Sequence, residues 1–215
     1  MRLDDALPII SGVLGKKFST LFEQLPEDLI INKGKVGQLL LLQIGLPLDS
    51  KLTDFEDGEL KTNKADEFGN PLETMFITQI STQIDNLINS PPQVFEETNL
   101  YKKIKKLLFV PTCKNSEDFG EWFFVSMHLV DLLQNASIGM QIKEDYYNIC
   151  AQLRAAVMES ESGQIHTASG KFIQVRSKDS KPYHPIFSHS LGRNISNKNY
   201  AFYFKKDFMK TIRSQ

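Results

Sequence analysis

The sequence predicts an α/β protein in which a mixed sheet is flanked by helices. Apolar residues recur at helical spacing over residues 4–23, 36–44 and 141–160. Short runs rich in β-branched and aromatic residues lie between these regions, at residues 59–62, 75–80, 106–110 and 122–128. We expect these four runs to make up one mixed sheet, with helices packed against it.

The predicted elements have recognisable ends. Gly12 and Gly15 can divide residues 4–23 into two helices, and Pro26 breaks the chain before the apolar helix at residues 36–44. Pro91-Pro92 predicts a loop, and Ser160 to Gly163 end the last long helix. We find neither an internal repeat nor a convincing linker. Residues 1–215 are therefore expected to form a single domain, in which a change of composition near residue 165 marks a second lobe.

Length and composition indicate an ordinary soluble globular protein. The 215 residues suffice for one substantial core, and 41% are hydrophobic and 24% charged. The two cysteines, Cys113 and Cys150, form neither a disulfide framework nor a metal-ligand spacing, which favours a reducing cytoplasm. No run approaches eighteen apolar residues, and the N-terminus lacks the apolar core of a signal peptide, so no membrane partner is expected.

The charge is unevenly distributed along the chain. Its net value is only −1, but residues 171–215 carry ten Lys and Arg against two Asp, a net charge of +8 that leaves −9 for residues 1–170. This asymmetry predicts a phosphate-facing surface in the C-terminal quarter. A basic, solvated tail is the alternative. Against it stand the interleaved aromatic residues Phe172, Phe202, Tyr203, Phe204 and Phe208.

Asp54, Glu59 and Lys61 form the clearest candidate site, in the segment DFEDGELKT at residues 54–62. On a strand, Glu59 and Lys61 point to one face and Leu60 to the other. Asp54 and Glu59 can offer oxygen ligands to Mg²⁺, and Lys61 can hold or activate a water that attacks a phosphodiester. An ordinary turn at Asp57-Gly58 would explain the same residues without chemistry, so the motif alone leaves both interpretations open.

Four further blocks surround this core in a fixed order. They are NKGKVGQLL at 32–40, GNPLETMF at 69–76, IQVRSK at 173–178 and FYFKKDF at 202–208. Together with the Asp…Glu-x-Lys core, they resemble MutH and the type II restriction endonucleases related to it, over about residues 10–210. The resemblance implies the restriction-endonuclease-like PD-(D/E)XK fold and Mg²⁺-dependent cleavage of double-stranded DNA at or near GATC to leave 5′-phosphates.

The same resemblance assigns roles to the catalytic lobe, at about residues 25–130. It implies that Asp54 and Glu59 bind the metal, that Lys61 positions the water, and that Lys33 lies near the catalytic centre. The chain departs from the family pattern at two points. Leu41 stands where the family usually has a glutamate, and the interval between Asp54 and Glu59 is shorter, which leaves Asp57 as an alternative to Asp54.

A DNA-reading lobe is expected at about residues 165–215. Arg176, Ser177 and Lys178 resemble the family's strand and loop that enter the major groove, where Arg and Lys can donate to guanine, although Ser177 replaces the usual proline. Tyr203 matches the tyrosine that, in MutH, lies against the adenine and is implicated in sensing its methylation; a core tyrosine on a final strand is the alternative. Phosphate contacts are expected from Lys205 and Lys206, and from Lys103 in the basic run at 102–106, unless that run is only solvated.

Three functional hypotheses remain at this point. The leading one is a type II restriction enzyme with a cognate methyltransferase, because the chain departs from the MutH pattern. The second is a MutH-like mismatch-repair nicking enzyme that depends on a MutL-like activator. The third is a catalytically silent DNA-binding or regulatory domain, for which Leu41 and the short Asp54–Glu59 interval are the evidence and against which the retained Glu59 and Lys61 count.

Overall fold

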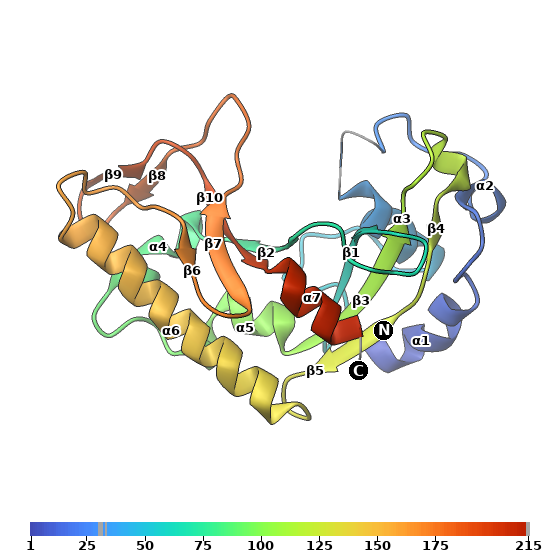
Figure 1. Ribbon diagram of the computed structural model, residues 1–215, viewed down its shortest axis with the longest axis horizontal. Coiled ribbons are helices and arrows are strands. Elements are labelled where there is room, and N and C mark those ends of the chain that lie inside the picture. Colours follow the sequence, from blue (N-terminus) through green and yellow to red (C-terminus); the bar gives the residue numbers. More distant parts are fainter. Residues whose placement is uncertain (30–31, 33, 214–215) are drawn as a thin grey trace. The chain divides into compact units, whose positions relative to one another are not determined.

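The computed structural model describes residues 1–29, 32 and 34–213, which fold into two compact units (Figure 1). Unit 1 comprises Met1–Glu73, Lys103–Asp131 and the residues from Met209 onward. Unit 2 comprises Thr74–Lys102 and Leu132–Phe208. Each unit has its own sheet. The expected arrangement of one domain with two lobes stays a prediction.

Unit 1 is built on a mixed sheet. Strand β1 (Glu59–Ala65) runs parallel to β3 (Lys106–Cys113), which also pairs antiparallel with β4 (Phe123–Phe124) and β5 (His128–Asp131). The helices are α1 (Leu3–Ser11), α2 (Phe18–Leu21), α3 (Lys35–Gln43) and the 3₁₀ helix η3 (Phe119–Glu121). The predictions of an α/β class, a mixed sheet and helices beside it are confirmed.

The core of unit 1 explains why its helices form where the sequence predicted them. Helix α3 buries Val36, Leu40 and Leu41 in the same cluster as Leu60 of β1. Residues 4–23 do form two helices, and Gly15 lies between them with a φ of 72°, a left-handed value that glycine adopts without strain.

Unit 2 has a second sheet, with strand order β2 (Met75–Gln79), β10 (Tyr200–Phe204), β7 (Ile173–Ser177) and β6 (Ala168–Ser169). A separate hairpin joins β8 (Ile186–Ser188) to β9 (Arg193–Ser196). The long helix α6 (Ala136–Met158) packs on β6 and β7. The short helices are η1 (Ser81–Gln83), α4 (Ile84–Ile88) and η2 (Phe95–Glu97), while α5 (Asn99–Ile104) and α7 (Lys206–Arg213) contribute residues to both units.

Two strand predictions need correction. The run at 75–80 is a strand, but it pairs with β10 and therefore belongs to the sheet of unit 2, not to the sheet that carries Glu59. The run at 122–128 is not one strand. Trp122 follows η3 and its indole donates to the carbonyl of Ser116, so that only Phe123–Phe124 and the residues from His128 onward pair with β3. Among the described helices, none has the length and apolar character needed to cross a membrane.

Candidate active site and nucleic-acid interface

A tight turn delivers the chain into β1. The N–H of Phe55 donates to the carbonyl of Gly58 at 2.9 Å, and Phe55 is buried. Gly58 is required by close approach, because a Cβ there would lie 2.7 Å from the carbonyl oxygen of Lys106 and 2.7 Å from Leu3 Cδ1. The turn is thus pressed between the start of α1 and the start of β3, and Glu59 follows directly at the first position of the strand.

The two aspartates of this turn have different surroundings. Asp57 accepts the N–H of Leu3 at 2.8 Å and the ammonium of Lys106 at 2.9 Å, so its carboxylate joins α1 to the start of β3. Asp54 accepts the N–H of Leu60 at 3.0 Å, and its own N–H donates to Glu59 Oε2 at 3.3 Å. Of the alternatives that the sequence left open, Asp54 is therefore the one that lies beside Glu59.

Glu59 is the centre of the cluster. Its side chain is only 2% exposed, and Oε1 accepts hydrogen bonds from the ammonium groups of Lys61 and Lys103, the latter at 2.8 Å. Leu60 packs into the core on the opposite face, as the alternation of a strand requires. A buried carboxylate is costly unless it is paired and hydrogen-bonded, and here two lysines meet that need.

Lys103 lies where the sequence alone did not predict it. It was expected among the phosphate contacts, but its side chain is 18% exposed and its ammonium pairs with Glu59. The parallel register of Glu59 with Leu107 explains this position, because it sets the beginning of β3, and the lysine run just before it, beside the beginning of β1. Only that pairing could have identified Lys103 as a member of the cluster.

Burial and the nearby carboxylate of Glu59 raise the pKa of Asp54 above its ordinary value of 3.8. A divalent cation held by both carboxylates would offset this unfavourable charge. Among the described residues, no three Asp, Glu, His or Cys side chains come together as a metal site. Two carboxylates are nevertheless sufficient for Mg²⁺, which keeps several waters, so the hard oxygen donors of Asp54 and Glu59 fit this ion.

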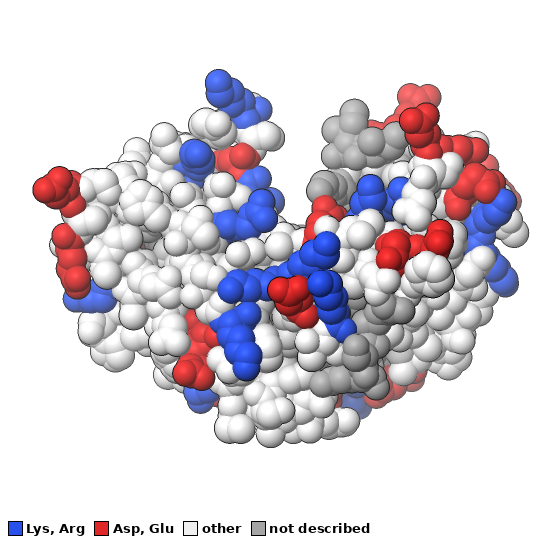
Figure 2. Space-filling view, in the orientation of Figure 1, with Lys and Arg blue, Asp and Glu red and all other residues white. Residues whose placement is uncertain are grey.

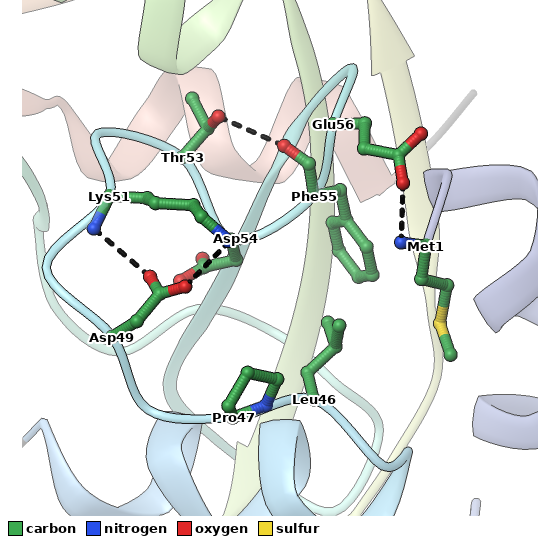
Figure 3. Close-up of a pocket in the computed structure, with 9 residues that line it drawn as sticks. All are labelled: Met1, Leu46, Pro47, Asp49, Lys51, Thr53, Asp54, Phe55 and Glu56. Carbon is green, nitrogen blue, oxygen red and sulfur yellow. Dashed lines mark hydrogen bonds and ion pairs between the residues drawn. The ribbon is translucent and has the colours of Figure 1, made fainter.

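A cavity of about 300 Å³ adjoins Asp54 (Figure 3). The residues that line this cavity form two ion pairs, one between Lys51 and Asp49 at 2.8 Å and one between the N-terminal amine and Glu56 at 2.7 Å. The lining residues are Met1, Leu46, Pro47, Asp49, Lys51, Thr53, Asp54, Phe55 and Glu56. Water and small ligands can therefore reach Asp54 although Glu59 itself is buried.

A second cluster lies on the sheet of unit 2 and combines cations with aromatic rings. The guanidinium of Arg176 lies 5.3 Å from the ring centre of Tyr203, and the ammonium of Lys178 lies 4.8 Å from that of Phe76. The two rings meet edge to face, 5.7 Å apart. Arg176 and Lys178 are exposed, and burial raises the pKa of the Tyr203 hydroxyl. Phe76 was not predicted as a site residue, although it lies in one of the four blocks; it joins the cluster because β2 pairs with β10 and sets it opposite Tyr203.

The other residues predicted to contact DNA differ in how far their side chains are exposed to solvent. Ser177 and Lys206 are exposed. Lys205 is half-buried, because its ammonium donates to the carbonyl of Gly170 within unit 2. Figure 2 shows Lys and Arg side chains over the loop that follows β7. Not every cation of the C-terminal quarter is available, since Arg193 donates to the carbonyls of Val157 and Gly163 at the end of α6.

Comparison with known proteins supports the predicted resemblance. No family model matches the chain. Three curated proteins named DNA mismatch repair protein MutH align with most of it. The chain is 28% identical to that of Buchnera aphidicola subsp. Baizongia pistaciae over 201 residues, 88% of this chain and 84% of that protein. The values are 28% over 200 residues for Citrobacter koseri and 26% over 193 residues for Escherichia coli O17:K52:H18, each covering 87% of this chain and 79% of the relative.

The chain is similar to MutH over most of its length. The resemblance inferred from the four ordered blocks is thereby confirmed, whereas membership of the PD-(D/E)XK class stays a prediction. At one of the points where the chain departs from the MutH pattern, Leu41 replaces the usual glutamate. Leu41 lies in the core of unit 1, so that position contributes no carboxylate to the cluster. Lys33, expected near the catalytic centre of a MutH-like protein, lies outside the described residues.

Proposed function

We propose that this protein is a Mg²⁺-dependent endonuclease that cuts double-stranded DNA at or near GATC. The observation that carries the proposal is the buried Glu59 carboxylate, which is held by Lys61 and Lys103 with Asp54 beside it. A buried ion pair is weak evidence for stability, because removing the charges from water offsets most of their attraction. A carboxyl group whose pKa is raised by burial and a neighbouring carboxylate, as that of Asp54 is, and which lines a cavity is instead typical of functional sites.

In this proposal, each side chain of the cluster in unit 1 has its own role. Asp54 and Glu59 would hold Mg²⁺, which when bound supplies Lewis-acid stabilisation and lowers the pKa of coordinated water. Lys61 would orient the attacking water and stabilise negative charge on the phosphate, and Lys103 would hold Glu59 in place. The water oxygen would bond to phosphorus as the P–O3′ bond breaks, which leaves a 5′-phosphate and a 3′-hydroxyl.

Unit 2 would read the DNA. Arg176 and Lys178 are exposed beside aromatic rings, and such cations can donate to guanine O6 and N7 in the major groove. Tyr203 would lie against adenine and respond to its methylation, as the MutH resemblance implies. Ser177 and Lys206 are exposed and would contact the backbone. GATC as the site rests on the resemblance alone.

Two forms of this proposal differ in what is cut. A restriction enzyme, paired with a methyltransferase, would cut both strands of unmethylated DNA, and the departure at Leu41 favours it over a repair enzyme. A nicking enzyme would cut one unmethylated strand with a MutL-like activator. The relatives favour this second form, because their names assign them to DNA mismatch repair.

A plasmid assay with Mg²⁺ tests the proposal. Supercoiled DNA with GATC sites would be supplied unmethylated, hemimethylated or fully methylated at adenine. Linear fragments from unmethylated DNA alone would support the restriction enzyme, and open circles from unmethylated or hemimethylated DNA would support the nicking enzyme. Lys61→Ala should abolish cutting and keep DNA binding, whereas Lys64→Ala, an exposed position on the same strand, should change neither. DNA that is bound but cut in no state would indicate a silent binding domain.

A further inference from the structure

A buried carboxylate on α6 holds the turn that leads into β7. Asp145 is 1% exposed, and no role was predicted for it. Its Oδ2 accepts the N–H groups of Phe172 at 2.6 Å and of Ile173 at 3.1 Å. Its Oδ1 accepts the N–H of Lys171 at 2.8 Å and the amide of Gln141 at 3.2 Å. Three successive backbone N–H groups form an anion-binding nest, and here the anion is a side chain of the protein itself.

The turn is shaped to receive this carboxylate. A Cβ on Gly170 would lie 2.3 Å from Asp145 Cγ and 2.6 Å from Oδ1, so only glycine allows so close an approach. About two turns further along α6, the side-chain amide of Gln152 both donates to and accepts from the backbone of Ser169, each at 3.1 Å. The turn between β6 and β7 is therefore hydrogen-bonded to the helix on both sides of Gly170.

The other side of the turn is fastened to the end of β10. The carbonyl of Phe172 accepts the backbone N–H of Lys205 at 2.8 Å, and the carbonyl of Gly170 accepts its ammonium. Backbone donors thus face Asp145 while backbone acceptors face Lys205. This arrangement gives Lys205 an internal partner, which explains why it is half-buried and less available to DNA than Lys206.

The fixed turn determines how β7 presents its side chains. Pairing with β6 covers only two positions, whereas pairing with β10 runs from Ile173 to Ser177. Because side chains alternate along a strand, a slip of one residue would turn Arg176 to the opposite face of the sheet. Asp145 binds the N–H of Ile173, the first residue of β7 and three positions before Arg176. It is therefore placed to set the register of this strand.

We infer that Asp145 is a positioning residue for sequence recognition, which holds Arg176 and Lys178 where they read the DNA bases. The inference rests on the proposed function. It requires the charge of Asp145 and not only its shape. Both carboxylate oxygens accept N–H donors, so an amide at this position would turn its own NH₂ group toward a backbone N–H in either orientation.

The test compares the binding of two short duplexes, one with an unmethylated GATC site and one with that site scrambled. Asp145→Asn should lower the ratio of specific to non-specific affinity by about tenfold, the loss expected when a base contact is misplaced. Affinity for the scrambled duplex should hardly change, because phosphate contacts dominate it. Lys143→Ala is the matched control, since this partly exposed residue lies on the same helix and forms an ion pair with Glu96 at 2.7 Å.

Rescue separates positioning from general stability. Asp145→Ala leaves the three N–H groups without their acceptor, so formate should restore the affinity ratio, whereas formamide at equal ionic strength should not. Gly170→Ala keeps the carboxylate but forces the turn away from it, so this variant should lose the same discrimination and gain nothing from formate. Gly170→Ala also serves as the test if the variants of Asp145 do not fold.

The outcomes distinguish the inference from the function on which it rests. A native protein that shows no preference for the GATC duplex would overturn the proposed function, and the inference with it. A native protein that discriminates, together with an unchanged ratio in Asp145→Asn or in Gly170→Ala, would overturn the inference alone. Equal rescue by formamide would also overturn it, because the nest would then need no charge.

Discussion

Replacing Lys103 with methionine removes one of the two cations that face Glu59 and keeps most of the side-chain volume. Glu59 is 2% exposed and Lys103 is 18% exposed, so solvent screens this pair weakly. Lys61 remains on the same oxygen, Oε1, and the backbone N–H of Asp54 remains on Oε2. The substitution thus removes one of the partners that stabilise the buried Glu59 carboxylate and leaves the others in place.

The size of the effect follows from these partners. Breaking a buried ion pair completely costs about 3–5 kcal/mol, and one hydrogen bond to a charged group is worth about 1.5–3 kcal/mol. Because Glu59 keeps one lysine, we expect Lys103→Met to lower the free energy of unfolding by about 1.5–3 kcal/mol. In a Glu59→Gln background the acceptor is neutral, and the same substitution should cost only about 1 kcal/mol.

Urea unfolding of the native protein, both single variants and the double variant would measure this coupling. Lys102→Met is the matched control, because Lys102 is exposed on the same helix and its loss should change the free energy of unfolding by less than about 0.5 kcal/mol. Equal costs of Lys103→Met in the two backgrounds would refute the reasoning, since they would show that Lys103 stabilises the protein without acting on Glu59.

Other perturbations separate the roles of neighbouring residues. The raised pKa of Asp54 means that the native state binds its proton more tightly than the unfolded chain does, so this residue lowers the free energy of unfolding as pH rises from 3.8 through the raised value. Asp54→Asn should therefore be the more stable protein at pH 7 in a thermal melt, yet it should not cut DNA. Asp57→Ala should lose about 1–2 kcal/mol of stability and keep cleavage, because Asp57 joins Leu3 to Lys106; a loss of metal-dependent cutting at unchanged fold would contradict this. Arg176→Ala should relax discrimination between duplexes by about 1–3 kcal/mol in a competition assay. Lys206→Ala should weaken binding to all sequences and reduce the slope of log affinity against log salt by about 1.

The local geometry of the candidate active site could be predicted from the sequence. Strand alternation places Glu59 and Lys61 on one face, and the structure agrees. The choice between Asp54 and Asp57 could not be made in this way, because both lie in one turn. It depends on the approach of Leu3 and Lys106, which are far from the turn in sequence. Lys103 joined the cluster through the parallel pairing of β1 with β3, which is equally non-local.

The sequence also could not predict which strands pair with one another. The run at 75–80 has the composition of a strand whichever sheet it joins, so its pattern could not reveal that β10 would be its neighbour. That pairing also brings Phe76 next to Tyr203, which is why an aromatic residue outside the predicted set belongs to the cluster on unit 2. Periodicity predicts which face a side chain takes, whereas its neighbours across the sheet depend on topology.

Counting charges along the sequence could not predict the DNA contacts either, because it gives the number of cations in a segment but not what each of them binds. Arg193 and Lys205 were counted in the basic C-terminal quarter, yet both donate to backbone carbonyls inside unit 2. Arg176 and Lys178 are exposed and lie over aromatic rings instead. Each of the hydrogen bonds from Arg193 and Lys205 takes up part of the cation's donors and holds the side chain at a fixed carbonyl, so it is less free to turn toward a phosphate. The sequence-specific contacts are therefore better sought at Arg176 and Lys178 than across the whole basic segment, and the turn that Asp145 holds is what sets their position on the sheet.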